Sequence, residues 1–210
     1  MSHALVIDDV SKRYTEHVAV NHLSLSVPTG TIYGILGPNG AGKSSTLRMV
    51  MNILSRDGGT ITLLGADPAK TPAVLKRVGY LPEERGLYKK MKVIDVIVFF
   101  AALKGVAEKA AQRDGTQWLD KMGLSQWKDS KVETLSKGMQ QKVQFITTVI
   151  HQPELLILDE PASESRSCES GSASRHDPWR QVGGKDRRAE HAQHGSGRGA
   201  VRLRMHHRRR

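Results

Sequence analysis

The sequence of 210 residues has a single cysteine, Cys168, which excludes a framework of intramolecular disulfides and favours a reducing compartment. Its apolar stretch at 93–104, VIDVIVFFAALK, is far too short to cross a bilayer. The first residues, MSHALVIDDV, lack the basic and then apolar order of a secretory signal. These absences predict a cytoplasmic protein that needs a separate partner for any role in a membrane.

The C-terminal segment 163–210 is poor in residues that build a core. It has one leucine and no isoleucine, and its 12 Lys and Arg residues against 5 Asp and Glu residues supply +7 of the chain's net charge of +11. Such a composition cannot bury enough apolar surface to offset the entropy lost on ordering. We therefore predict a structured domain over 1–162 and a basic, disordered tail over 163–210.

A glycine-rich segment follows the apolar run 32–36. Residues 37–45 read GPNGAGKSS and fit the phosphate-binding pattern G-x-x-x-x-G-K-[ST]. Glycines let backbone N–H groups turn around a polyphosphate, Lys43 supplies a positive charge, and the Ser44 hydroxyl can ligate Mg²⁺. A helix over 44–54 would add a dipole that favours an anion. A chance Gly-rich turn is the alternative that this motif and its context disfavour. The predicted ATP-binding residues of this loop are Gly37, Pro38, Asn39, Gly40, Ala41, Gly42, Lys43, Ser44 and Ser45.

A second nucleotide signature lies at 155–160. The run LLIL at 155–158 is typical of a buried parallel strand, and it ends in Asp159 and Glu160. Because α/β sheets bind ligands at the carboxyl ends of their strands, we assign Asp159 to Mg²⁺, directly or through a water. Glu160 is the predicted general base that polarises the attacking water. Alone, such a strand end is more often structural, and the phosphate loop upstream reverses that weighting.

The segment 135–145, LSKGMQQKVQF, resembles the signature loop of ABC transporter ATPases, which commonly reads LSGGQ. Lys137 and Met139 replace the usual second glycine and the glutamine. The resemblance covers residues 1 to about 162. It implies an α/β fold of the P-loop NTPase class, of the ABC ATPase type, with a mixed sheet and a helical subdomain at about 87–137.

In that family the signature loop contacts the γ-phosphate of a nucleotide held mainly by the partner subunit. The resemblance implies this role for Ser136 and Gly138, which precede or begin a helix and so offer another site for an anion. The plainer interpretation is that Ser136 is the N-cap of this helix, and the two roles are compatible.

Two further positions match the family in order. Tyr14 matches the aromatic residue that stacks on adenine, with a plain surface tyrosine as the alternative. The segment 79–83, GYLPE, matches a loop in which most members carry glutamine where this chain has Glu83. A carboxylate can still ligate Mg²⁺, since it is a hard oxygen donor. In the family this loop also couples the ATPase to a membrane-spanning subunit. The sequence LPEERGLY resembles that of a subgroup of bacterial ABC exporters of the sodium- and drug-efflux type.

The tail departs from the family, whose members continue with a sequence like SGLDP. Residues 164–170 can be encoded by codons that, after removal of one nucleotide from the first codon, read Gly-Leu-Asp-Pro-Val-Asn. The same shifted frame at 190–195 can encode Ser-Thr-His-Asn-Met, which looks like the family's switch-histidine loop. Our hypothesis is that the tail is out of frame. The nucleotide-binding domain would then be incomplete, with an unpaired edge beside the nucleotide strand and impaired hydrolysis.

The sequence thus predicts the ATP-binding subunit of an ABC transporter, an exporter, that hydrolyses MgATP as a homodimer beside a transmembrane permease subunit, at the inner face of the cell membrane. One alternative is a soluble ABC-type ATPase that acts on nucleic acid or ribosomes. Such proteins usually carry tandem cassettes or long coiled-coil insertions, which this chain does not have. The other alternative is nonspecific nucleic-acid binding through the basic tail, which has one aromatic residue, Trp179.

Overall fold

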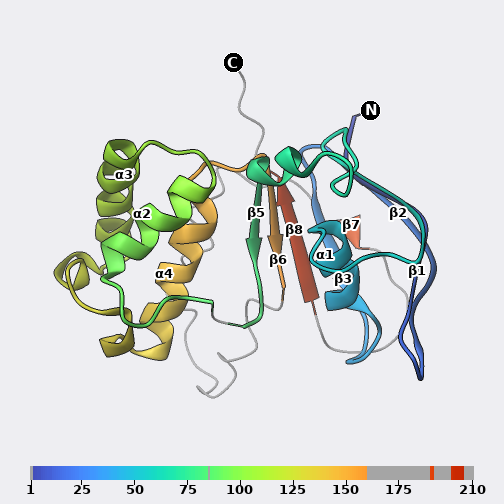
Figure 1. Ribbon diagram of the computed structural model, residues 1–210, viewed down its shortest axis with the longest axis horizontal. Coiled ribbons are helices and arrows are strands. Elements are labelled where there is room, and N and C mark those ends of the chain that lie inside the picture. The colour runs from blue at the N-terminus through green and yellow to red at the C-terminus, as the bar shows by residue number, and fades with distance from the viewer. Residues whose placement is uncertain (1, 85, 160–189, 192–199, 206–210) are drawn as a thin grey trace.

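The computed structural model describes residues 2–84, 86–159, 190–191 and 200–205 (Figure 1). In chain order its elements are β1 (His3–Arg13), β2 (Val18–Pro28), β3 (Ile32–Leu36), α1 (Lys43–Val50), β4 (Gly58–Leu63), the 3-10 helix η1 (Pro72–Arg77), β5 (Val78–Leu81), α2 (Val93–Leu103), α3 (Glu108–Lys121), η2 (Ser125–Trp127), η3 (Val132–Thr134), α4 (Lys137–Val149), β6 (Leu155–Leu158), β7 (Glu190–His191) and β8 (Ala200–Met205).

An antiparallel sheet of order β2-β1-β4 forms one side of the molecule. Side chains alternate between the two faces of a strand, and this puts Leu5 and Ile7 of β1 in the interior. They pack in one core with Leu47 and Val50 of α1 and with two residues of β6, Leu155 and Ile157. Burial of this shared core fixes α1 between the antiparallel sheet and the strands beside it.

The central sheet has the order β5-β6-β8-β3-β7. β5 and β6 are parallel, and β8 is antiparallel both to β6 and to β3. β3 and β6 therefore run in the same direction, and their carboxyl ends lie at one edge of the sheet. The loop after β3 and Asp159 after β6 consequently meet at this edge.

β8 is a feature that the composition of the tail did not predict. It lies between β3 and β6 and pairs with both. The edge of β6 that we expected to be unpaired is therefore paired with β8. The physical reason for this pairing is that β3 and β6 are separated by the width of one strand. Without a strand between them, both would have unpaired backbone N–H and C=O groups along the edges that face each other. The sequence AVRLRM, which alternates apolar and charged residues, can fill that gap as a strand. Residues 190–191 of the tail also form a strand, β7, which pairs with β3. The disorder predicted for residues 163–189, 192–199 and 206–210 concerns residues outside the described part of the chain.

The helices α2, α3 and α4 form a second core on the far side of the central sheet from β1 and β2 (Figure 1). Val93, Ile97 and Ala101 recur at helical spacing and are buried on one face of α2. α3 packs closely against that face at Gly115. A Cβ added there would lie only 2.9 Å from the Ile97 side chain, so the lack of a side chain allows this close approach. The predicted α/β fold with a mixed sheet and a helical subdomain is confirmed.

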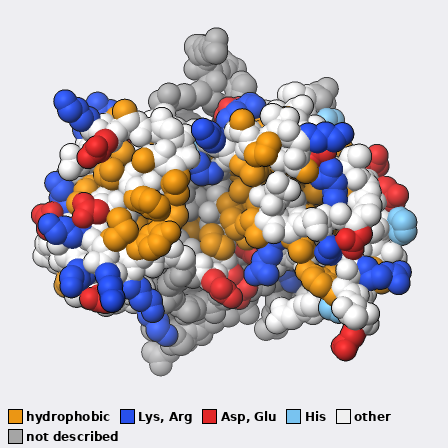
Figure 2. All heavy atoms as spheres, viewed as in Figure 1, with side chains coloured by type: hydrophobic (Ala, Val, Ile, Leu, Met, Phe, Trp, Pro, Cys, Tyr) orange, Lys and Arg blue, Asp and Glu red, His pale blue; other side chains and the backbone are white. Residues whose placement is uncertain are grey.

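The surface of this helical part exposes large apolar side chains. Tyr88, Phe99 and Leu103 are 52%, 37% and 58% exposed. Figure 2 shows apolar side chains gathered on the face of the helical part over α2. Across the described residues, no helix has both the length and the apolar character that a membrane span requires.

Candidate nucleotide-binding site

The predicted phosphate loop joins the end of β3 to the beginning of α1. Gly40 and Gly42 have φ values of 82° and 79°, in the left-handed region that favours glycine. A Cβ at Gly42 would lie 2.2 Å from the carbonyl oxygen of Ala19 in β2, so a side chain cannot fit there without movement of the backbone. Gly42 is thus required both by the conformation of the turn and by its close contact with the neighbouring strand β2.

Lys43 is folded back onto this loop. Its side chain donates hydrogen bonds to the carbonyl oxygens of Gly37 and Pro38, each 2.9 Å from Nζ. The residue is only 7% exposed. Since a buried ammonium needs polar partners, the loop's own carbonyls hold the charge at the centre of the predicted phosphate cradle.

Ser44 and Asp159 meet at the carboxyl edge of the central sheet. The Mg²⁺ role that the sequence predicts for both residues stays a prediction. The Ser44 hydroxyl donates to Oδ1 of Asp159 at 3.2 Å. Asp159 is 2% exposed, and its backbone N–H donates to the Leu81 carbonyl at 2.9 Å. A hydroxyl and a carboxylate are both hard oxygen donors, so the pair fits a magnesium ion.

Tyr80 of β5 completes this cluster, a role that the sequence did not indicate. Its hydroxyl donates to the other oxygen of the same carboxylate, Oδ2 of Asp159, at 3.4 Å. Burial, and next the negative charge of Asp159, raise the pKa of Tyr80 to about 12, although the Arg48 guanidinium opposes the shift. Tyr80 therefore remains a protonated donor at neutral pH. The one feature of the sequence that could have pointed to Tyr80 is its place in the segment GYLPE, which matches a loop of the family.

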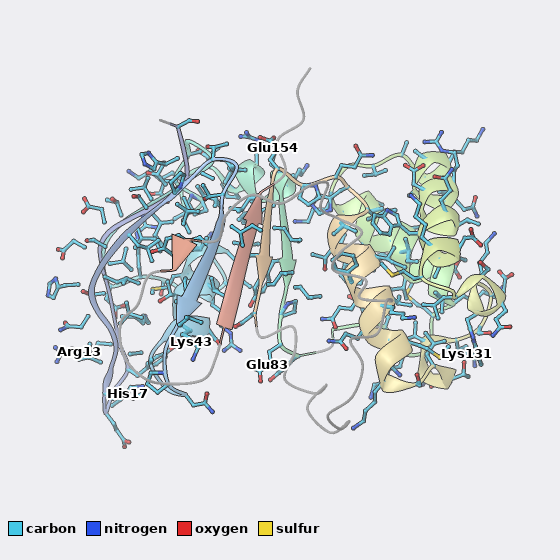
Figure 3. All side chains as sticks on the ribbon, turned by 180° about the vertical axis from the view of Figure 1, so that it is seen from behind. Arg13, His17, Lys43, Glu83, Lys131 and Glu154 are labelled. Carbon is cyan, nitrogen blue, oxygen red and sulfur yellow. The ribbon has the colours of Figure 1, made fainter. Side chains whose placement is uncertain are left out.

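Glu83 follows β5 and lies with Lys43 at the same end of the central sheet (Figure 3). It is exposed, and among the described residues no hydrogen bond joins it to Ser44 or Asp159. The structure therefore brings Glu83 to the correct edge without placing it in the cluster. Glu160, the predicted general base, lies outside the described residues.

Tyr14 lies just after β1 and is 38% exposed. Its ring stacks on His17, with 5.3 Å between ring centroids and 26° between planes, and the Lys12 ammonium lies 5.9 Å from its centroid. Figure 3 shows His17 at the end of the molecule that also carries Lys43. This arrangement is compatible with adenine stacking and with a surface tyrosine, so the role of Tyr14 stays a prediction.

The predicted signature loop begins α4. The Ser136 hydroxyl accepts a hydrogen bond from the backbone N–H of Met139 at 3.3 Å, which confirms the predicted N-cap. Ser136 and Gly138 are exposed, and a Cβ at Gly138 would meet nothing within 4 Å. Figure 1 shows α4 on the opposite side of β5 and β6 from α1, so this loop and the phosphate loop lie in different parts of one chain.

The fold and the phosphate loop define a P-loop NTPase. The sequence model described as "ABC transporter" matches residues 20–163, and the chain belongs to the ABC transporter family. This match ends one residue beyond the predicted domain boundary at 162.

Individual proteins agree with the family match. The ABC transporter ATP-binding protein YhaQ of Bacillus subtilis is 47% identical over 159 residues, which cover 76% of this chain and 53% of YhaQ. The linearmycin resistance ATP-binding protein LnrL of the same species is 34% identical, over 75% of this chain and 51% of LnrL. A solved structure titled as the ATP-binding subunit of an ABC transporter has a TM-score of 0.66 and 26% identity, and the match covers 76% of this chain and 67% of that one.

The chain spans about half the length of the curated relatives it matches. Other relatives carry the names of export and import proteins alike. Nothing in these comparisons supports the predicted nucleic-acid partner.

Proposed function

We propose that this chain is the ATP-binding subunit of an ABC transporter and binds MgATP through the loop 37–45. The single observation that carries the proposal is the junction of buried Lys43 with the Ser44–Asp159 pair at one edge of the sheet. A cation held inside a glycine-rich turn, beside two hard oxygen donors, suits a polyphosphate that carries a divalent metal. Bound Mg²⁺ would neutralise charge on the β- and γ-phosphates.

Hydrolysis requires the residues of the chain to do three things. Lys43 and the loop hold the phosphates, Ser44 and Asp159 hold the metal, and Glu160 accepts a proton from the attacking water. Glu83 is proposed as a further metal ligand on the loop after β5. Tyr14 is proposed to stack on the adenine base.

The proposed assembly is a homodimer in which Ser136 and Gly138 of one copy reach the nucleotide of the other. The separation of α4 from α1 within one chain supports this arrangement, since α4 lies on the opposite side of β5 and β6 from α1 (Figure 1). ATP would close the dimer and hydrolysis would reopen it.

The proposed membrane partner is a separate permease subunit at the cytoplasmic face. The exposed apolar side chains of Tyr88, Phe99 and Leu103 support a protein contact on the helical part. Export is the proposed direction of transport, and it rests on the resemblance of LPEERGLY to exporters.

We propose that hydrolysis by this chain is impaired because the tail is out of frame. The end of the family match at 163 and the change of composition there support this proposal. Sequencing the gene across codons 160 to 170 tests it. Codons incompatible with the shifted motifs would show that the tail is a genuine extension. If the extra nucleotide is real, removing it is expected to raise the ATPase rate of the purified protein.

Nucleotide binding is tested by titrating ATP in the presence of Mg²⁺ by calorimetry. Lys43→Ala is expected to weaken binding by roughly 10- to 150-fold, since hydrogen bonds to a charged group contribute about 1.5–3 kcal/mol. Lys109→Ala removes the same charge from an exposed position on α3 and is expected to bind like the wild type. Equal affinities for all three proteins would refute the assignment of the loop.

A further inference from the structure

The two oxygens of the Asp159 carboxylate accept hydrogen bonds from different elements. Oδ1 accepts from Ser44 at the beginning of α1 at 3.2 Å, and Oδ2 accepts from Tyr80 on β5 at 3.4 Å. The backbone of Asp159 is itself tied to β5 through the bond from its N–H to the Leu81 carbonyl, 2.9 Å long. The carboxylate thus lies between a hydroxyl of the phosphate-loop helix and a hydroxyl of the neighbouring strand.

Two donors constrain this group more than one does. The terminal torsion of an aspartate is broad, so a single hydrogen bond leaves the carboxylate plane free to rotate. A second donor on the other oxygen removes that freedom, and water has little access because Asp159 is 2% exposed. Partners that hold a metal ligand in place commonly matter nearly as much as the ligand itself.

We propose that Tyr80 is a positioning residue for the metal site: its hydroxyl holds Oδ2 of Asp159 so that Oδ1 faces Ser44 and the phosphate loop. The proposal rests on the proposed function, because Asp159 needs this orientation only if it serves a metal beside the nucleotide. The pairing of β5 with β6 supports it, since Tyr80 and Ile157 are register partners and Asp159 lies two residues further along β6's chain direction.

A purely structural role for Tyr80 is the competing explanation. Its ring packs against the core formed by the antiparallel sheet, α1 and β6. Phenylalanine keeps the ring and removes only the hydroxyl, so Tyr80→Phe separates packing from positioning. Tyr33→Phe removes the same atom from β3, which is separated from β6 by β8.

The test is calorimetric titration of ATP at a series of Mg²⁺ concentrations and, separately, in excess EDTA. We expect Tyr80→Phe to keep the ATP affinity measured in EDTA and to need about tenfold more Mg²⁺ for half of the metal-dependent gain in affinity. Tyr33→Phe should match the wild type in both conditions. Asp159→Asn sets the scale for loss of the carboxylate itself.

Each outcome has a distinct meaning. If the wild type binds MgATP better than ATP in EDTA and Tyr80→Phe has the same Mg²⁺ requirement, the positioning role is refuted while the proposed function stands. If Tyr80→Phe weakens binding equally in EDTA and in Mg²⁺, the hydroxyl acts structurally and the inference is again refuted. If the wild type itself binds no ATP under either condition, the proposed function fails and takes this inference with it.

Discussion

The side-chain amide of Gln144 donates a hydrogen bond to the backbone carbonyl oxygen of Glu84, with 3.1 Å between Nε2 and O. Gln144 is 6% exposed and belongs to α4, the helix that begins at the signature loop. Glu84 adjoins Glu83 in the loop after β5. This polar contact therefore ties the signature helix to the loop that carries the proposed additional metal ligand.

Replacing Gln144 by alanine should loosen this loop. The Glu84 carbonyl loses a buried donor, so we expect a loss of about 1 kcal/mol in the free energy of unfolding and faster hydrogen exchange over residues 82–87. Hydrogen exchange followed by mass spectrometry measures the local effect. Gln112→Ala on α3, at an exposed position, is the matched control and should change neither quantity. Unchanged exchange at 82–87 in Gln144→Ala would show that the contact does not order the loop.

Replacing Gly42 by alanine should abolish ATP binding and destabilise the fold. The new Cβ would lie 2.2 Å from the Ala19 carbonyl oxygen, in addition to the strain of a φ of 79°. The left-handed conformation alone costs about 1–2 kcal/mol for a residue with a Cβ. Gly65→Ala has a φ of 85° with nothing within 4 Å of its Cβ, so it reports the strain without the collision. Denaturant unfolding of both variants separates the two effects. Equal losses of stability would mean that the contact with β2 is easily relieved.

The phosphate loop and Asp159 could be predicted from the sequence because their signals are local. Glycines at fixed spacing determine the turn, and an apolar run followed by an acid determines the strand end. Tyr80 and Gln144 could not be predicted, because their roles depend on which segments become neighbours in space. Tyr80 acts on Asp159 only because β5 pairs with β6. β8 was missed for a different reason: composition averaged over the whole tail hides one short alternating stretch.

Acid should destabilise the protein through His151. Burial, and next the positive charge of Lys104, lower the pKa of His151 to about 4. Its Nε2 lies 3.2 Å from the Val78 carbonyl, and its buried Nδ1 has no hydrogen-bond partner within the part of the chain that the structure describes. Between pH 6.5, the ordinary pKa of the group, and about 4, the unfolded chain binds a proton that the folded chain does not. Stability therefore falls as the pH falls through this window.

His151→Gln removes this titration and keeps an amide nitrogen near the Val78 carbonyl. The free energy of unfolding of the wild type should fall by about 1–2 kcal/mol more than that of the variant between pH 7 and 4, allowing for solvent screening of a partly exposed ring. Urea unfolding at several pH values measures the difference, in which the titration of carboxylates cancels. Parallel stability curves for the two proteins would show that His151 is protonated as readily in the folded state as in the unfolded one.

Glu83 offers the sharpest test of how far the family resemblance extends into the metal site. The residue is exposed and, among described residues, makes no hydrogen bond to Ser44 or Asp159, so its replacement by glutamine should change the free energy of unfolding by less than about 0.5 kcal/mol. If its carboxylate ligates Mg²⁺, Glu83→Gln should raise the Mg²⁺ concentration needed for ATP binding several-fold, since an amide oxygen carries no charge. The affinity for ATP in EDTA should stay unchanged. Glu84→Gln is the matched control, because only the backbone carbonyl of Glu84 takes part in the contact with Gln144. An identical Mg²⁺ requirement for the two variants and the wild type would exclude Glu83 from the metal site and leave Ser44 and Asp159 as its protein ligands.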